Sequence, residues 1–181
     1  MADTTRFRFD GGALWLNLLA TQGQSFGPRP IERLPTPAAA DDWLTLAGFP
    51  PRAPITDTEL GRLIELREAL REFAAAAVDG RDPSPAVLAH IHHAAESGSV
   101  ATVPAMVRQG SFSVDAVLAT LALHALVTTR SPDRAYLKEC GETDCRWVFL
   151  DTSGRRHWCP SPACASRGRV RAHRARQAQE S

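Results

Sequence analysis

The chain has 181 residues, of which 44% are hydrophobic and 23% are charged, and its formal net charge is +1. These values are typical of a globular protein of one or two domains and exclude a collagen-like or low-complexity chain. The N-terminus lacks the basic and apolar regions of a signal peptide, and the longest apolar run, residues 116–127, is too short to span a bilayer. We therefore expect a cytoplasmic protein with no membrane segment.

Charge is distributed unevenly along the chain. Residues 130–181 carry eleven Arg and Lys against six Asp and Glu, whereas residues 1–129 carry ten against fourteen. The two parts are therefore formally +5 and −4. This asymmetry, together with the change from an apolar to a polar segment at Pro132, predicts two domains, residues 1–131 and 132–181.

The N-terminal part contains several helix signals and few strand signals. Residues 7–23 are typical of a short strand around Phe7 and Phe9 followed by a helix, and residues 24–35 are typical of a loop. Residues 99–112 are irregular or form a weak hairpin. Four further helices are expected: one that starts at Thr36-Pro37 and stops at Gly48, and three over residues 56–78, 84–97 and 113–129.

Charged side chains accompany two of these helices. On residues 56–78, the charges that include Arg67 and Arg71 are expected to form ion pairs on a solvated surface. On residues 84–97, His90, His93 and Glu96 can share one face. No second ligand-bearing element accompanies them, so the pattern favours a surface rather than a metal site.

All the cysteines of the chain lie within 25 residues: Cys140, Cys145, Cys159 and Cys164. Two Cys-x4-Cys pairs separated by thirteen residues suit tetrahedral coordination by four thiolates, so the spacing predicts a structural Zn²⁺ site. The alternatives are two disulfides or four unrelated buried thiols, and disulfides are rare in the cytosol. Four protein ligands leave the metal no open position, and no nucleophile pairing is evident, so we do not expect an enzyme.

The thirteen residues between the two pairs are expected to fold as a β-hairpin. Residues 147–150 have strand character, residues 151–154 form a turn, and residues 155–158 return as the partner strand. A helix that is N-capped by Ser161 is expected to begin at Pro162. The predicted fold class is therefore mainly α: a helical N-terminal domain with a short β element, followed by a small zinc-bound β-hairpin and helix.

Two segments resemble known families. The cysteine region reads Cys-x4-Cys-x-Trp-x-Phe-Leu-Asp-x-Ser, then Arg-x-Trp-Cys-x4-Cys and an Arg-rich helix. This pattern resembles the CGNR zinc finger of bacterial transcription regulators. The Cys-Gly-Asn-Arg signature of that family corresponds to Cys164-Ala-Ser-Arg167 in this sequence. The N-terminal part contains three further motifs: Phe7-x-Phe9-x-Gly-Gly-x-Leu14-x-Leu16, Asp42-Trp43-Leu44 and residues 66–71. Together they resemble the ABATE domain of stress-induced transcription regulators. The resemblance implies transcriptional regulation. The N-terminal domain would then be a sensor of a small-molecule ligand or a homodimerisation unit.

The C-terminal arginines indicate a polyanionic partner. Seven arginines occur from Arg155 to Arg176 with no acidic residue among them. On a helix that starts at Pro162, three arginines share one side, and two more lie on the adjoining strand, so we expect double-stranded DNA to contact Arg155, Arg156, Arg167, Arg171 and Arg174. The alternatives are a solvated helix, a zinc-stabilised protein-interaction module that docks an acidic partner such as the N-terminal domain, and a zinc-thiolate redox switch.

Overall fold

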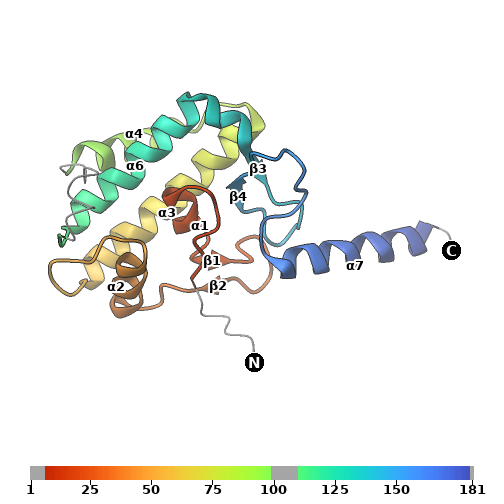
Figure 1. Cartoon of the computed structure of the whole chain (residues 1–181), viewed down its shortest axis with the longest axis horizontal. Helices are drawn as coiled ribbons and strands as arrows, with labels where there is room; N and C mark the ends of the chain where they lie inside the picture. Colours follow the sequence, from red (N-terminus) through yellow and green to blue (C-terminus); the bar gives the residue numbers. More distant parts are fainter. Residues whose placement is uncertain (1–6, 99–109, 180–181) are drawn as a thin grey trace.

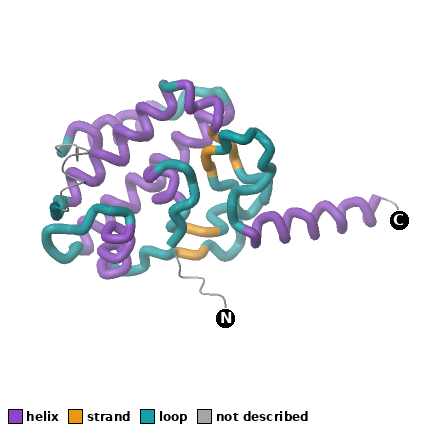
Figure 2. Tube along the Cα trace, in the orientation of Figure 1, coloured by secondary structure: helices purple, strands orange, loops and turns teal. Residues whose placement is uncertain are grey.

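The computed structural model describes residues 7–98 and 110–179 as a helical body from which one C-terminal helix extends (Figure 1). The described part of the chain is mainly helical, with short strands near both of its ends (Figure 2), and this confirms the predicted fold class. Among the described residues, no helix is both long enough and apolar enough to cross a membrane. The helices are α1 (Leu14–Leu19), α2 (Pro37–Leu46), α3 (Asp57–Asp79), α4 (Pro85–Glu96), α6 (Val114–Arg130), the 3-10 helix η1 (Pro132–Tyr136) and α7 (Pro162–Gln179). The strands are β1 (Gln22–Gly23), β2 (Ile31–Glu32), β3 (Leu137–Glu139) and β4 (Val148–Leu150).

Local capping interactions fix the starts of α2, α3, α4 and α6. In α3, the Thr56 hydroxyl accepts a hydrogen bond from the Glu59 N–H, and the Glu59 carboxylate accepts one from the Thr56 N–H at 2.9 Å. Gly80 ends the helix with φ at 69°, a left-handed conformation that glycine adopts without strain. Side-chain caps of the same kind start three other helices: Thr36 for α2, Ser84 for α4 and Ser113 for α6.

One apolar core joins the helical body to the C-terminal segment. α3, α4 and α6 pack against one another, and α1 lies against both α3 and α6. Trp15 and Trp43 are fully buried within this core, and the same cluster continues into Trp147 and Phe149 of the C-terminal segment. Because a buried side chain of this size contributes roughly 1.5 to 3 kcal/mol, the two segments stabilise each other.

The short β element lies in a different place from the one predicted. Residues 7–10 form no strand, whereas β1 pairs with β2 in antiparallel register, Gln22 opposite Glu32, inside the region interpreted as a loop. The ring of Phe9 stacks on Trp43 at 6.1 Å, so this side chain covers the core without a backbone ladder. Residues 99–109 lie outside the described part of the chain, and they make up most of the segment predicted to be irregular or a weak hairpin, residues 99–112.

Arg67 is buried, which corrects the prediction of a solvated charged face on α3. Its side chain is only 2% exposed, and its guanidinium donates to both carboxylate oxygens of Glu32, at 2.8 and 2.7 Å. It also donates to the Thr21 hydroxyl at 3.1 Å and to Glu68 at 2.7 Å. This bidentate pair fastens β2 to α3, and because Glu32 is distant in sequence, helical periodicity could not reveal it.

The partner of β4 is also different from the one predicted. β4 pairs with β3, which precedes the first cysteine pair, and residues 155–158 form no strand. The other edge of β4 is taken, since the Leu150 N–H donates to the Gly11 carbonyl at 2.9 Å. The Asp151 carboxylate accepts hydrogen bonds from Ser153 and from the Arg156 N–H, so it folds this segment into a compact loop. The Ser153 hydroxyl first, and then the Arg156 N–H, lower the pKa of Asp151 to about 2.

Candidate metal centre and basic surface

Two tight turns bring the cysteines together. Cys140 follows β3, and the Cys145 N–H donates back to the Glu142 carbonyl at 2.9 Å, which closes the first turn. In the second turn, the Cys164 N–H donates to the Ser161 carbonyl at 3.1 Å as α7 begins at Pro162, where the sequence predicts it. The Gly141 N–H donates to the His157 carbonyl at 2.9 Å and so joins the two turns.

The four sulfur atoms are placed as a tetrahedral metal site requires. The Sγ atoms of Cys140, Cys145, Cys159 and Cys164 all lie within 4.8 Å of one another, and all four residues are buried. A Zn–S bond of about 2.3 Å places tetrahedral sulfurs roughly 3.8 Å apart, so the cluster fits one Zn²⁺ after a small contraction. The four thiols are free rather than joined in disulfides. The predicted zinc cofactor is therefore confirmed, and these four cysteines are the residues that would hold it.

The electrostatics of the cluster favour a bound cation. The contact with Cys145 lowers the pKa of Cys140 to about 7, and the contact with Cys140 also lowers the pKa of Cys159. The same sulfur contacts, followed by burial, raise the pKa of Cys145. Four neighbouring buried thiols therefore cannot all ionise by themselves, and a divalent cation compensates the negative charge of four thiolates.

Hydrogen-bond donors surround the sulfurs. The Cys159 N–H donates to Cys140 Sγ at 3.3 Å. The Arg8 guanidinium lies 3.8 Å from Cys159 Sγ, and the Arg167 guanidinium lies 3.5 Å from Cys164 Sγ. These positive groups offset part of the charge of about −2 that four thiolates and one Zn²⁺ carry.

Two of the five predicted DNA contacts, Arg167 and Arg171, have partners inside the finger. Arg171 contacts the Glu142 carboxylate at 3.1 Å and the Thr143 hydroxyl at 2.7 Å, and it also pairs with Asp144. Arg167 Nε lies 3.8 Å from the same Glu142 oxygen. The Glu142 side chain is 0% exposed, so these arginines compensate a buried negative charge beside the metal centre.

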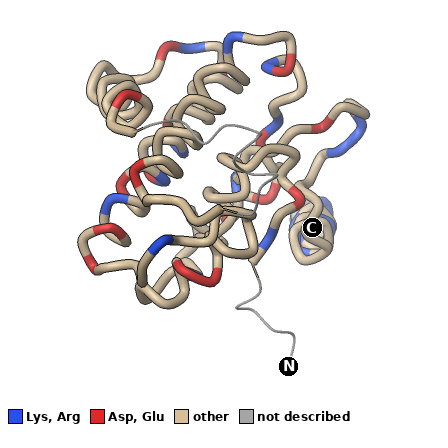
Figure 3. Tube along the Cα trace, turned by 60° about the vertical axis from the view of Figure 1, so that its left-hand side comes forward, with Lys and Arg blue, Asp and Glu red and all other residues tan. Residues whose placement is uncertain are grey.

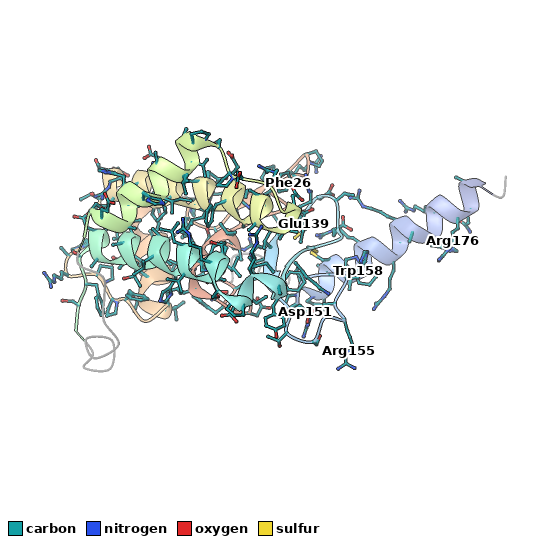
Figure 4. All side chains as sticks on the ribbon, turned by 90° about the horizontal axis from the view of Figure 1, so that it is seen from above. Phe26, Glu139, Asp151, Arg155, Trp158 and Arg176 are labelled. Atoms are coloured by element: carbon teal, nitrogen blue, oxygen red, sulfur yellow. The ribbon has the colours of Figure 1, made fainter. Side chains whose placement is uncertain are left out.

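Other arginines, in the loop after β4 and on α7, are exposed to solvent. Arg155, Arg156 and Arg174 are exposed, and no carboxylate of a described residue pairs with their side chains. Arg176 is also exposed, and the Arg169 guanidinium lies 5.5 Å from the ring centre of Trp158. Figure 3 shows Lys and Arg gathered on α7, and Figure 4 shows Arg155 and Arg176 extending to the same side of the molecule in that view. The unpaired arginines therefore belong to the loop after β4 and to the distal half of α7.

The two tryptophans beside the cysteines have different roles. Trp147 is buried, and its indole N–H donates to the Leu16 carbonyl of the helical body at 2.9 Å. Trp158 is half-buried against α7, where a Cβ atom on Gly168 would approach its Nε1 to 2.3 Å. Gly168 therefore lets α7 lie directly on the Trp158 ring, and the helix is fixed at its base by this contact and by the cysteines.

Sequence reasoning missed several residues that shape this site: Arg8, Arg33, Glu142 and Asp144. For the two acids a signal existed, because Glu142 and Asp144 lie between the first two cysteines, and the predicted metal site brings those cysteines beside the start of the basic helix. For Arg8 and Arg33 no signal existed, since both reach the finger from the distant N-terminal segment.

Comparison with known protein families agrees with this architecture. Residues 12–132 match the ABATE family model, described as "Putative stress-induced transcription regulator". Residues 136–177 match the model of the CGNR zinc finger. A comparison with curated proteins gives no match.

Proposed function

The chain belongs to the ABATE family of putative stress-induced transcription regulators and carries a CGNR zinc finger, and from this premise we propose that it binds double-stranded DNA through the finger. The zinc centre holds the base of α7 in place, and the arginines of α7 and of the neighbouring loop contact the DNA. No chemical step on the metal is needed, because four thiolates fill its coordination sphere.

The observation that carries this proposal is the set of arginines without an acidic partner. Arg155, Arg156, Arg174 and Arg176 are all exposed, and none pairs with a carboxylate of the residues that the structure describes. Fixed positive charges of this kind gain free energy when they displace the counterions of a phosphate backbone. Guanidinium groups are also the side chains best suited to bidentate contacts with phosphate and with guanine edges.

The shape of α7 supports the same conclusion. The helix has 18 residues, so it is roughly 27 Å long, and it extends away from the helical body (Figure 1). An exposed α-helix has the width that the major groove of B-DNA admits. The side chains of the distal half of α7 whose burial the structure describes are exposed, so that half is accessible to a polyanion.

We assign Arg167 and Arg171 a positioning role next to these contacts. Both hold α7 against Glu142, and Arg171 remains about half exposed at 49%. Arg171 can therefore reach one phosphate at the edge of the interface while its other contacts orient the helix. Direct contacts are assigned to Arg155, Arg156, Arg174 and Arg176.

The test is the salt dependence of binding to a labelled pool of random duplex DNA. The Arg174→Ala/Arg176→Ala double variant should bind more weakly and should reduce the slope of log K against log salt by about 2, since two phosphate contacts are lost. Arg29→Ala/Arg130→Ala is the matched control, because it removes the same charge from exposed positions on the helical body. Equal losses in the two double variants, or no salt dependence in the parent protein, would refute the proposal.

A further inference from the structure

A cavity of about 240 Å³ lies where the helical body meets the finger. The cavity is lined by the β1–β2 hairpin, including Gln22 and Ile31, and by Trp147 and the start of α7. Three guanidinium groups line it, those of Arg8, Arg33 and Arg167. Cations in a cavity are unfavourable unless negative groups compensate them, and the three arginines differ in the partners they have.

Arg8 and Arg167 each have a negative partner. Arg8 donates to the Asp10 carboxylate at 2.8 Å and also contacts Cys159 Sγ. Arg167 contacts Cys164 Sγ and lies near Glu142. These two side chains therefore serve the metal centre and its surroundings.

Arg33 differs from both. Among the described residues, its guanidinium donates one hydrogen bond, to the backbone carbonyl of Ala20 at 3.1 Å, and its Nε is buried with no partner. The neighbouring carboxylate, Glu32, is already occupied by Arg67. Burial, and then the like charge of Arg8, lower the pKa of Arg33. The negative charges of Glu32 and of the Cys145 sulfur, which lines the same cavity, act on this pKa in the opposite direction. No carboxylate of the described residues pairs with the Arg33 guanidinium, so an anion that enters the cavity can still gain free energy from it.

Two further features favour a ligand over isolated water. Ser161 and Ala163 place the first turn of α7 at the cavity wall, where the helix dipole attracts negative charge. Ala20, Ile31 and Trp147 supply an apolar surface next to the charges. A site that combines a few convergent polar groups with apolar walls is typical of small-molecule recognition.

We propose that this pocket binds a small organic anion, with its phosphate or carboxylate group held by Arg33 and its apolar part packed against Ile31 and Trp147. The volume equals that of roughly eight water molecules, so the ligand has on the order of ten non-hydrogen atoms. This site is separate from the exposed arginines of the distal half of α7, and the proposal does not depend on DNA binding.

The test uses isothermal titration calorimetry on the full-length zinc-loaded protein, at constant ionic strength, with inorganic phosphate and phenyl phosphate as probes. We expect saturable 1:1 binding, tighter for phenyl phosphate because its ring contacts the apolar wall. Arg33→Gln should weaken binding at least about tenfold, as expected when a charged hydrogen bond is removed. Arg29→Gln, at an exposed arginine in the loop between β1 and β2, is the matched control and should bind as the parent does.

A second variant keeps the test independent of the folding of Arg33→Gln. Ala163→Glu adds a carboxylate at the rim of the cavity, on an exposed position in the first turn of α7, where a negative charge stabilises a helix. It should retain zinc and thermal stability but lose phosphate affinity. Absence of saturable binding up to about 10 mM, or equal binding by Arg33→Gln, Ala163→Glu and Arg29→Gln, would overturn the proposal. So would a result in which Arg33→Gln weakens duplex DNA binding only, because the anion would then be a DNA phosphate.

Discussion

The indole N–H of Trp147, on the finger, donates a hydrogen bond to the backbone carbonyl of Leu16, in the first helix of the body, at 2.9 Å. Both residues are buried, so this bond crosses the junction of the two segments without competition from water. Next to it, a Cβ atom on Gly11 would lie 2.8 Å from the Trp147 ring, so only glycine permits this approach. The finger is therefore attached to the helical body through a specific polar contact as well as through apolar packing.

Trp147→Phe should destabilise the protein by about 1 to 3 kcal/mol, because the buried Leu16 carbonyl loses its indole donor and keeps only the longer hydrogen bond from the Ala20 N–H, at 3.3 Å. Thermal unfolding followed by circular dichroism measures this as a fall of several degrees in Tm, with zinc content unchanged. Trp158→Phe is the matched control, since the Trp158 Nε1 has no hydrogen-bond partner among the described residues. A larger loss in the control than in Trp147→Phe would contradict this account of the junction.

Glu32→Gln should cost about 3 kcal/mol at neutral pH, because it leaves the buried Arg67 guanidinium without its bidentate counterion. Chemical denaturation measures the free energy of unfolding. Glu65→Gln, on the exposed side of the same helix as Arg67, should change it by no more than about 0.5 kcal/mol. Similar values for the two variants would show that the Arg67–Glu32 pair contributes little.

The contribution of Glu32 should depend on pH in a defined direction. Burial raises its pKa, but the hydrogen bonds from Arg67 outweigh this, so the pKa of Glu32 is lowered in the folded protein. A lowered pKa means that the unfolded chain binds the proton more readily. The stabilisation is therefore complete above the unfolded pKa of about 4.5 and is lost as the pH falls through the folded value.

The measurement is the difference in unfolding free energy between the parent protein and Glu32→Gln as a function of pH. Acid also releases zinc, but this affects both proteins equally and cancels in the difference. The difference in unfolding free energy should stay constant from pH 7 to about 5 and decrease at lower pH. A difference in unfolding free energy that increases as the pH falls would contradict a stabilising ion pair between Arg67 and Glu32.

Asp144→Asn should strengthen DNA binding by about two- to threefold at low salt, since Asp144 pairs with Arg171 and competes with phosphate for it. The substitution preserves the shape of the side chain. Asp133→Asn, an exposed acid of η1, removes the same charge away from α7 and should have a smaller effect. Fluorescence anisotropy with duplex DNA provides the comparison, and weaker binding by Asp144→Asn would mean that Asp144 orients Arg171 productively.

Features that depend on neighbouring residues could be read from the sequence. Thr56 and Glu59 lie one helical turn apart, so their capping box required no tertiary knowledge, and the cysteine spacing alone indicated the metal site. Features that depend on distant residues could not. The partner strand of β4 lies before Cys140 rather than after Asp151, because Gly11, from the other end of the chain, occupies the second edge of β4. Arg67 looked like a surface charge for the same reason, since its counterion lies 35 positions away.

The most direct test of the central claim is a chelator titration in which zinc release and duplex DNA binding are followed in the same sample. One zinc per chain should be present at the start, and DNA affinity should fall in proportion to the zinc released and return when zinc is restored. Protein that has lost all its zinc and still binds DNA with unchanged affinity and salt dependence would contradict the claim that the metal centre holds the DNA-binding helix in place.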